Sequence, residues 1–556
     1  MDDALRDENA HVLDILEVCE EKLPDLTSES LFAGSRSWSL RRLTARLEHI
    51  GLLQKHKVYT SEIPPVGTRI MTHRWVDKDS FDAMKSRFTA RGFEQLLSGE
   101  EEFFAPTPRE ASMRLLLAWA EVNGYIVAVG DAAQAFLESP LQEDGPFYVK
   151  PPEEAEERPG VAWRLHKTLP GLKGSPAAWG DYSTEILRTK HGLVPTQREP
   201  CLYKMEAADE KDSNVEKVWA LRHMDDFLFV GKRSTLDPPL ESLGNYLLLR
   251  DVQFLENPGD CVRFLGREIV KREGGYDLAV NRQLAQDIVD DAGTIGRRTF
   301  GAPGAKDSKK DITPLTPRDH SYYRTQVGRL LLYCQYKADM QYSVSQLSRH
   351  VGAPMQWNLL ALKRLVRYLA VTMDMVLEMR PRKSGPRTLR TASDADWAGL
   401  DDRKSVSSAC VFFCESLIMS YSRVQATPAL SSCESELYAL GSAASESLWV
   451  AGAIQEAFQL DVIPVIEGDS SSALALASRS GVGRLRHIEI RLLAIQEWTQ
   501  RKRLMLKKIP TATNVSDIGT KFLAAARTAE LADMLGIRFP GSPTSGRGVS
   551  ASIPAE

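Results

Sequence analysis

Two adjacent aspartates, Asp225 and Asp226, stand between two short apolar runs and constrain this chain more than any other feature. The runs read VWAL before the pair and FLFV after it. Short apolar runs on both sides of a polar pair predict a β-hairpin whose tight turn carries the pair. A third aspartate, Asp131, ends a strand-like segment that begins at Tyr125. Carboxylates on a hairpin turn and a neighbouring strand can hold two divalent metal ions, the arrangement that phosphoryl transfer by polymerases needs, whereas an isolated Asp-Asp pair is more often only a turn.

A second set of acids lies in the C-terminal third with a different spacing. Asp394 ends a strand-like segment, Glu436 lies in the first turn of an amphipathic helix, and Asp469 follows an apolar strand. Asp517 lies in a late segment, and Glu434 is the alternative to Glu436 at the helix start. Each acid alone is more often a solvated surface group or a helix cap. In this order, on these elements, the four form the carboxylate cluster of ribonuclease H folds, which holds two metal ions for phosphodiester hydrolysis.

Size and composition limit the class of protein. A chain of 556 residues is too long for one ordinary domain. The net charge of −4 means that any nucleic-acid contact must come from local basic patches. Seven cysteines without a CxxC pair or a Cys/His zinc pattern predict reduced thiols inside a cell. The acidic start lacks the layout of a signal peptide, and no apolar run reaches membrane-spanning length, so we expect no membrane contact.

Hydrophobic periodicity and composition divide the chain into five segments. Helical spacing dominates 1–60 and 311–385, and the latter ends in a basic hinge with Pro and Gly. Helices and strands alternate over 61–310 and again over 386–525. The remainder, 526–556, is expected to be a partly disordered tail.

Around the first set of acids the sequence resembles the reverse transcriptases of copia-type (Pseudoviridae-like) LTR retrotransposons. The matching blocks are RWV, KSRFTARGF, EFFAP, DAAQAFL, KTLPGLKGSP, EPCLY and HMDD. Around the second set it resembles the ribonuclease H of the same Pol polyproteins. The blocks there are SDADWAG, DRKS, LSSCESE, GDSSSAL, RHIEIR and SDIGTK. A gag-type zinc knuckle, a short protease motif and a His/Cys integrase head are missing, so the resemblance covers only the reverse transcriptase and ribonuclease H portion.

The resemblance implies an α+β multidomain fold: a right-hand polymerase of fingers, palm and thumb with a connection, followed by a ribonuclease H-like α/β domain. After a helical N-terminal leader at 1–60, fingers and palm would occupy 61–310. The thumb and connection would occupy 311–385 and the ribonuclease H domain 386–525, before the tail. The implied function is an RNA-directed DNA polymerase with ribonuclease H activity, acting by two-metal phosphoryl transfer at both sites.

The resemblance also implies partners and a location. The nucleic-acid partners would be an RNA template, a DNA primer and an RNA–DNA hybrid, and the small substrates deoxynucleoside triphosphates. A homodimer or an integrase is the implied protein partner. The location would be the cytoplasm, in a virus-like particle, or the nucleus. Two alternatives stay open: a catalytically decayed retrotransposon relic that binds nucleic acid, and a ribonuclease H without polymerase activity.

Roles carry over from the resemblance residue by residue. The implied ligands of Mg²⁺ or Mn²⁺, two ions per active site, are Asp131, Asp225, Asp226, Asp394, Glu436, Asp469 and Asp517. The implied nucleotide-binding residues are Arg87 and Arg91 on the triphosphate, Phe136 at the sugar 2′ position and Gly171 at a close backbone approach. His487 would help product leave or shuttle a proton. His223 and Pro170 depart from the family pattern beside the nucleotide and primer, but leave the metal ligands intact.

Overall fold

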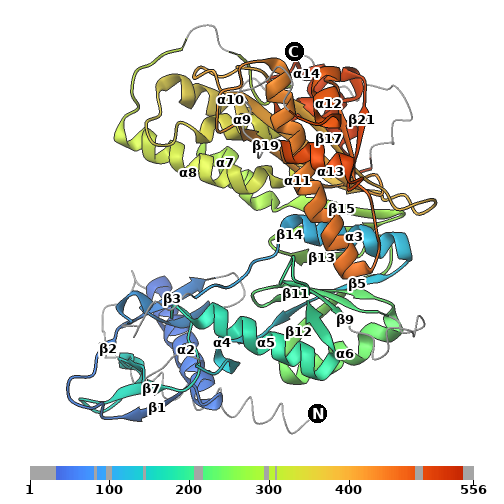
Figure 1. Cartoon of the computed structure of the whole chain (residues 1–556). Helices are drawn as coiled ribbons and strands as arrows, with labels where there is room; N and C mark the ends of the chain where they lie inside the picture. Colours follow the sequence, from blue (N-terminus) through green and yellow to red (C-terminus); the bar gives the residue numbers. More distant parts are fainter. Residues whose placement is uncertain are drawn as a thin grey trace. The chain divides into compact units, whose positions relative to one another are not determined.

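The structure is a computed structural model, and its described residues form two compact units with interleaved chain segments (Figure 1). It describes 33–79, 84–95, 103–141, 146–205, 217–293, 300–306, 310–481 and 493–541, with only the backbone of 33–39. Unit 1 takes the chain up to Thr107, Ala132–Gly192 and Glu241–Arg250. Unit 2 takes Pro108–Asp131, Leu193–Leu240 and the chain from Asp251 onward. The result is a mixed α/β multidomain fold.

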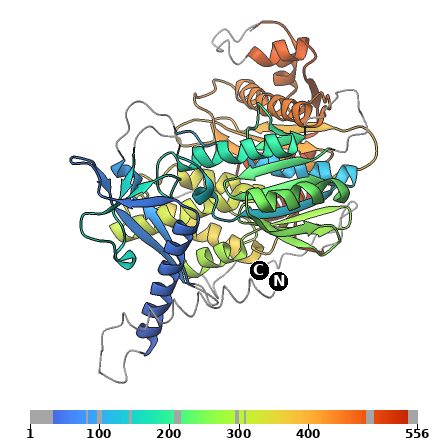
Figure 2. The same cartoon turned by 90° about the horizontal axis from the view of Figure 1, so that it is seen from below.

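Unit 1 is built on helix α2 (Ala33–Lys55), which lies within the predicted helical leader; residues 1–32 lie outside the described part. The ribbon of β3 (His73–Asp79) and β4 (Met84–Ala90) packs on α2, as Figure 2 shows in blue. A four-stranded sheet has the order β1-β7-β6-β2. Its strands are β1 (Tyr59–Glu62), β7 (Ala162–Leu165), β6 (Tyr148–Val149) and β2 (Ile70–Met71), and the remaining helices are α4 (Ala135–Glu138), α5 (Ser175–His191), η1 (Gly92–Glu94) and η2 (Glu153–Ala155). Phe88 and Trp163, both fully buried, lie in the core that joins ribbon and sheet.

A six-stranded sheet, to which unit 2 contributes most of the strands, carries the first set of acids. Its order is β12-β5-β11-β10-β9-β8, with β12 (Leu249–Leu255), β5 (Ile126–Ala132), β11 (Asp226–Gly231), β10 (Trp219–His223), β9 (Leu202–Met205) and β8 (Leu193–Pro195). The predicted hairpin is confirmed: β10 and β11 pair antiparallel, and His223 lies opposite Asp226. Helix α6 (Arg233–Tyr246) follows β11 and passes from unit 2 into unit 1.

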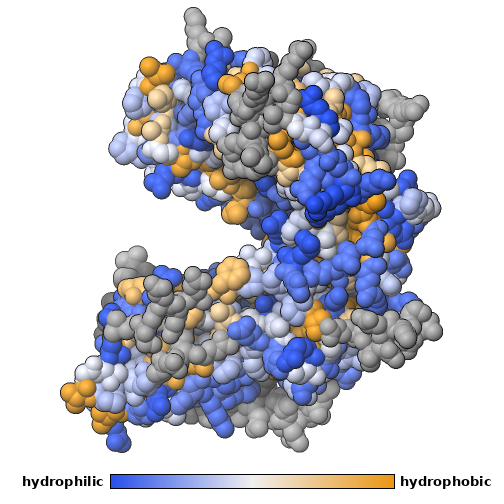
Figure 3. Space-filling model, viewed as in Figure 1, coloured by the Kyte–Doolittle hydropathy of each residue, from blue (hydrophilic) through white to orange (hydrophobic). Residues whose placement is uncertain are grey.

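The apolar run from Leu115 to Val129 folds as a buried helix followed by a strand. Helix α3 (Glu110–Asn123) contacts β11 on one side and strands of other sheets elsewhere, so Leu116 and Leu117 are fully buried. Gly124, at φ 67°, ends the helix before β5. Among the described residues no helix combines the length and apolarity needed to cross a bilayer. On the face that Figure 3 shows, hydrophilic residues prevail and hydrophobic ones are scattered.

A second sheet of unit 2 combines distant parts of the chain. Its order is β13-β14-β15-β16-β22, with β13 (Cys261–Phe264), β14 (Arg267–Arg272), β15 (Gly275–Val280), β16 (Val376–Met379) and β22 (Ile537–Arg538). The associated helices are α7 (Arg282–Asp291), α8 (Pro317–Tyr333), η3 (Cys334–Tyr336), α9 (Ala338–Ser348) and α10 (Gln356–Thr372).

The first part of the predicted C-terminal tail, residues 526–541, belongs to this fold. Residues 526–556 begin within α14 (Ala525–Met534) and continue into β22, which pairs with β16. Leu531 and Ile537 are buried to 0% and 1% exposure, and burial of such side chains stabilises the segment. Residues 542–556 lie outside the described part of the chain.

A third sheet of unit 2 carries the second set of acids. Its order is β19-β18-β17-β20-β21, with β19 (Ser416–Val424), β18 (Val406–Phe413), β17 (Leu389–Ala395), β20 (Val465–Gly468) and β21 (Met505–Lys508). The first three strands are antiparallel, and β20 and β21 continue the sheet in parallel to β17. The helical segments are α11 (Ser432–Phe458), α12 (Ser471–Ser478), α13 (Ala494–Gln500), η5 (Thr511–Thr513) and η6 (Val515–Gly519).

The long helix α11 ties the third sheet to the six-stranded sheet (Figure 1). At its C-terminal end the Phe458 ring stacks on Trp119 with centroids 4.2 Å apart. The Trp219 indole donates a hydrogen bond of 2.8 Å to the carbonyl of Ala457. The Glu456 carboxylate accepts bonds of 2.8 and 3.1 Å from the backbone N–H groups of Gln197 and Arg198. Residues 386–525 are therefore joined to strands far upstream by aromatic and charge-assisted contacts.

We expect Phe458→Ala to lower the free energy of unfolding of the full chain by about 3–5 kcal/mol, because it leaves a cavity between two tryptophan rings. Urea unfolding followed by tryptophan fluorescence measures this loss. Leu332→Ala is the matched control: Leu332 is 56% exposed, so its truncation should change stability by less than about 0.5 kcal/mol. Equal effects of the two substitutions would show that the α11 contact contributes nothing to the fold.

Candidate functional site

The first candidate site is the group of three aspartates at one end of the six-stranded sheet. Strand β5 pairs antiparallel with β11, and this register sets Asp131 directly opposite Asp226. Asp225 lies in the two-residue turn that joins β10 to β11, where Met224 has a φ of 55°. The turn and the neighbouring strand thus bring the three sequence-predicted acids to one place, all within unit 2.

Electrostatics at this turn favour a bound proton or cation. Burial, followed by the charges of Asp225 and Asp131, raises the pKa of Asp226 to about 6. Asp131 is exposed, so solvent screens its part of the repulsion. Burial also lowers the pKa of His223, against the opposing effect of Asp225, so the imidazole is neutral at physiological pH.

The four sequence-predicted nucleotide residues belong to unit 1. Arg87 on β4 and Arg91 just after it are exposed, and Phe136 in α4 is half-buried. Gly171, at φ 95°, lies where a loop meets the end of β4: the backbone N–H of Gly92 donates to its carbonyl at 3.2 Å. A Cβ added there would stand 2.1 Å from the Ala90 carbonyl oxygen, so close backbone packing alone requires glycine.

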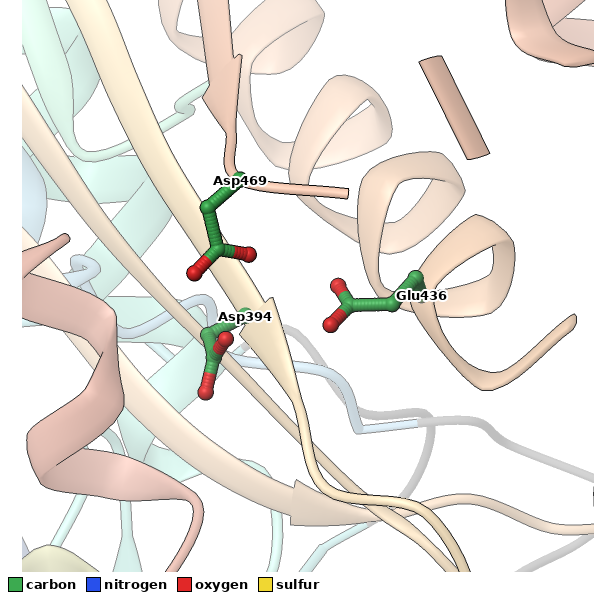
Figure 4. A group of neighbouring side chains, drawn as sticks. All are labelled: Asp394, Glu436 and Asp469. Atoms are coloured by element: carbon green, nitrogen blue, oxygen red, sulfur yellow. The ribbon is translucent and has the colours of Figure 1, made fainter. Parts of the chain in front are cut away.

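The second candidate site is a tighter group of carboxylates at the edge of the third sheet (Figure 4). Asp394 lies near the C-terminal end of β17, and Asp469 directly follows β20. Because β17 and β20 are parallel neighbours, these ends meet at the same edge, and Glu436 points toward them from the first turns of α11. Each of the three offers an oxygen within 4.8 Å of the others. Elsewhere in the described ranges, no other set of three His, Cys, Asp or Glu side chains meets this criterion.

Burial and mutual repulsion raise the pKa values of Asp394 and Glu436 in this group. Burial first, then the charge of Asp517, raises the pKa of Asp394 to about 7, although the Thr520 hydroxyl that bonds it opposes this. Burial, then Asp394 and Asp469, raises the pKa of Glu436 to about 9. Converging carboxylate oxygens that resist ionisation fit Mg²⁺ or Mn²⁺, because a divalent cation replaces the protons and removes the repulsion.

The choice between Glu434 and Glu436 is settled by the hydrogen bonds of Glu434. Its carboxylate accepts a bond of 2.8 Å from the backbone N–H of Leu430 and another from the Tyr438 hydroxyl. Its own backbone N–H donates to the Ser431 side chain, which caps α11. Glu434 therefore stabilises the N-terminus of α11, and Glu436 is the acid that lies in the cluster with Asp394 and Asp469.

The segment around η6 orients Asp394. The Thr520 hydroxyl donates a bond of 2.7 Å to the Asp394 carboxylate. The Asn514 amide donates to the carbonyl of Ser393 at 3.0 Å, and the Ser516 hydroxyl donates to that of Ala392 at 2.7 Å. These supports were missed in the sequence, although Ser516 and Thr520 stand in the SDIGTK block.

The fourth predicted ligand, Asp517, is not in the converging group. It is 6% exposed, and its Oδ1 lies 2.6 Å from the ammonium of Lys521. Arg527 approaches its other oxygen at 3.8 Å. Lys521 was also missed, although its place four residues after Asp517 in the SDIGTK block is the signal that could have identified it. His487 lies outside the described residues.

Known proteins resemble this chain over most of its length. The reverse transcriptase (RNA-dependent DNA polymerase) family matches residues 56–306. The Pol polyprotein of transposon RE1 from Arabidopsis thaliana is 28% identical over 492 residues, covering 87% of this chain and 32% of that protein. The Pol polyprotein of TNT 1-94 from Nicotiana tabacum is 27% identical over 526 residues, covering 91% and 38%. Residues 56–306 of this chain therefore belong to the reverse transcriptase family, and the chain is similar to copia-type retrotransposon Pol polyproteins over most of its length.

The chain spans about a third of the length of the curated relatives it matches first. A solved foamy viral protease-reverse transcriptase in complex with double-stranded DNA superposes with a TM-score of 0.48 at 11% identity, covering 84% of this chain and 69% of that one.

The raised pKa values of Asp394 and Glu436 give a testable pH dependence. Both groups hold protons more tightly in the folded chain than in the unfolded one. Without metal, the folded chain therefore loses stability as the pH rises from 3.8 to about 7 for Asp394 and from 4.5 to about 9 for Glu436. We expect Glu436→Gln to be more stable than wild type at alkaline pH by about 1–2 kcal/mol, and equal to it at acidic pH. Urea midpoints measured in EDTA from about pH 5 to about pH 9 test this. The exposed Glu497→Gln serves as control, and parallel pH curves for Glu436→Gln and wild type would contradict the assignment.

Proposed function

We propose that this chain is an RNA-directed DNA polymerase that also cleaves the RNA strand of RNA–DNA hybrids. The observation that carries the proposal is the presence, in one chain similar to copia-type Pol polyproteins, of two carboxylate clusters at the ends of two different sheets. Polymerisation and hybrid cleavage are both phosphoryl transfers that such clusters can support with divalent ions.

For polymerisation, Asp131, Asp225 and Asp226 would hold Mg²⁺ or Mn²⁺, two ions at the site. Bound there, the metal supplies charge stabilisation for the attacking and leaving oxygens. The pKa of Asp226, raised to about 6, means that this carboxyl gives up its proton readily at neutral pH when a cation arrives. His223 is neutral and half-buried, so it can lie beside a primer without adding charge.

Residues of unit 1 would bind the incoming nucleotide and select deoxynucleotides over ribonucleotides. Arg87 and Arg91 are exposed cations whose planar guanidinium groups suit triphosphate oxygens. The half-buried ring of Phe136 would crowd a ribose 2′-hydroxyl and so favour deoxynucleotides. Gly171 has no side chain to block a nucleotide from the backbone. The substrates are deoxynucleoside triphosphates on a DNA primer paired to an RNA template.

For hybrid cleavage, Asp394, Glu436 and Asp469 would hold the divalent ions, with Asp517 nearby. Thr520 keeps the Asp394 carboxylate pointed at the site through a bond of 2.7 Å. Recognition of RNA over DNA requires contact with a 2′-hydroxyl beside the scissile phosphate. His487 is proposed to help product leave.

One observation favours a second candidate, a ribonuclease H without polymerase activity. Within the described part of the chain, only the Asp394, Glu436 and Asp469 oxygens converge within 4.8 Å, and the three aspartates of the hairpin site do not. Primer extension on poly(rA)/oligo(dT) with Mg²⁺ or Mn²⁺ decides between the two. DNA synthesis supports the bifunctional enzyme; hybrid cleavage without synthesis supports the nuclease alone.

We expect Asp225→Asn to reduce DNA synthesis at least about a hundredfold and to leave RNA cleavage nearly intact, because an amide cannot offset the charge of a metal ion. Asp469→Asn should give the reverse pattern. Extension and hybrid-cleavage assays on the same preparations measure both. The control is Asp237→Asn, an exposed acid on α6. Retained synthesis in Asp225→Asn would overturn the polymerase site.

Phe136→Val should raise ribonucleotide incorporation severalfold relative to deoxynucleotides, because a smaller side chain opens space for the 2′-hydroxyl. Single-nucleotide extension with ATP and dATP compares the two substrates directly. Leu137→Val is a neighbouring control, since Leu137 is buried at 3% exposure and packs in the core of unit 1. An unchanged preference in Phe136→Val would mean that Phe136 only packs.

A further inference from the structure

Asp517, the acid beside the second cluster, is paired with two cations. Asp517 is nearly fully buried, and Lys521 lies four residues further along the chain, after the end of η6, with its ammonium 2.6 Å from Oδ1. Arg527 stands further away, at 3.8 Å from Oδ2. A buried carboxylate is costly unless it is paired, and these two cations supply the pairing for Asp517.

The two cations differ in their freedom to move. Arg527 also binds Glu530 at 2.9 Å and the carbonyl of Thr511 at 3.3 Å, and its side chain is 23% exposed. The Lys521 side chain is 49% exposed. A lysine ammonium is a point charge on a flexible stem, so it can leave Asp517 without breaking other structure.

The charge of Lys521 reaches the whole cluster. Burial lowers the pKa of its ammonium, but the bond to Asp517 and the charges of Asp394 and Asp469 raise it overall. Lys521 in turn opposes the rise in the pKa of Glu436. A divalent ion that entered between Asp394 and Asp517 would meet this positive charge.

We propose that Lys521 is a positioning residue that acts as the built-in counter-ion of Asp517, so that the centre takes up one divalent ion at Asp394, Glu436 and Asp469 and admits a second beside Asp517 only when the Lys521 ammonium moves away. The proposal rests on the metal centre proposed above for hybrid cleavage. Its physical basis is competition between two cations for one carboxylate. An ammonium and a metal ion bound to the same carboxylate repel each other, so each weakens the binding of the other.

The test is Mn²⁺ binding to the full chain, measured by calorimetry and by the electron paramagnetic resonance of free Mn²⁺. Asp225→Asn and Asp226→Asn are present in all samples, so that the hairpin site contributes little. We expect the parent to bind one ion tightly and a second at least tenfold more weakly. Lys521→Gln should lower the dissociation constant of the second ion at least tenfold, and Lys502→Gln, an exposed lysine away from the cluster, should not change it.

Two further measurements separate this role from simple structural pairing. Without metal, Lys521→Gln should melt at a lower temperature than the parent chain that carries only Asp225→Asn and Asp226→Asn, since Asp517 loses a partner. Added Mn²⁺ should raise the melting temperature of Lys521→Gln by more than it raises that of the parent. Lys521→Arg keeps the charge and can grip both oxygens, so second-ion binding should weaken about threefold or more. This variant tests the proposal even if Lys521→Gln does not fold, and equal or tighter second-ion binding in it would overturn the proposal.

The outcomes also separate the inference from the function on which it rests. Unchanged Mn²⁺ binding in Lys521→Gln, with or without a lower melting temperature, makes Lys521 a structural counter-ion only and overturns the inference, while the metal centre stands. A parent chain that binds no Mn²⁺ at all overturns the centre itself. The competition is supported only if the second Mn²⁺ ion binds more tightly to Lys521→Gln than to the parent and its affinity is unchanged in Lys502→Gln.

Discussion

Repulsion among like-charged carboxylates is the constraint on which the rest of this structure depends. Asp394 and Glu436 are held together with their pKa values raised to about 7 and about 9, so the fold must supply free energy to keep them there. It does so with parallel strands β17 and β20, whose ends cannot separate without breaking the sheet. Thr520 then holds the Asp394 carboxylate toward the site instead of letting it turn to solvent.

Helix α11 links this local constraint to the rest of unit 2. Its first turns carry Glu436. Its last residue, Phe458, stacks on Trp119 of α3 and meets Trp219 of β10 edge-on. A shift of the helix along its axis would therefore misplace a carboxylate at one end and open an aromatic contact at the other. The same helix that completes the second cluster also contacts β9, a strand of the six-stranded sheet that carries Asp131 and Asp226.

Local pattern was enough to predict the features that depend on neighbours in sequence. The apolar runs around Asp225 define a hairpin, and the strand and helix positions of Asp394 and Glu436 follow from periodicity. Features set by distant partners were not predictable in this way. Nothing in the composition of 526–538 indicates that Ile537 pairs with Leu377. The ion pair between Asp517 and Lys521 likewise depends on how η6 folds.

The two clusters differ in how much their stability should depend on metal. Asp131 is exposed, so water can screen the hairpin site, where burial raises the pKa of Asp226 to about 6. Asp394 is 4% exposed, and its cluster relies on protons, on Lys521 or on a metal ion for neutrality. A centre of this kind loses stability in alkaline, metal-free solution, whereas the hairpin site keeps a solvated carboxylate whether or not an ion is bound. The same chemistry thus places different demands on the fold at its two sites, and the more buried one requires the larger set of supporting residues.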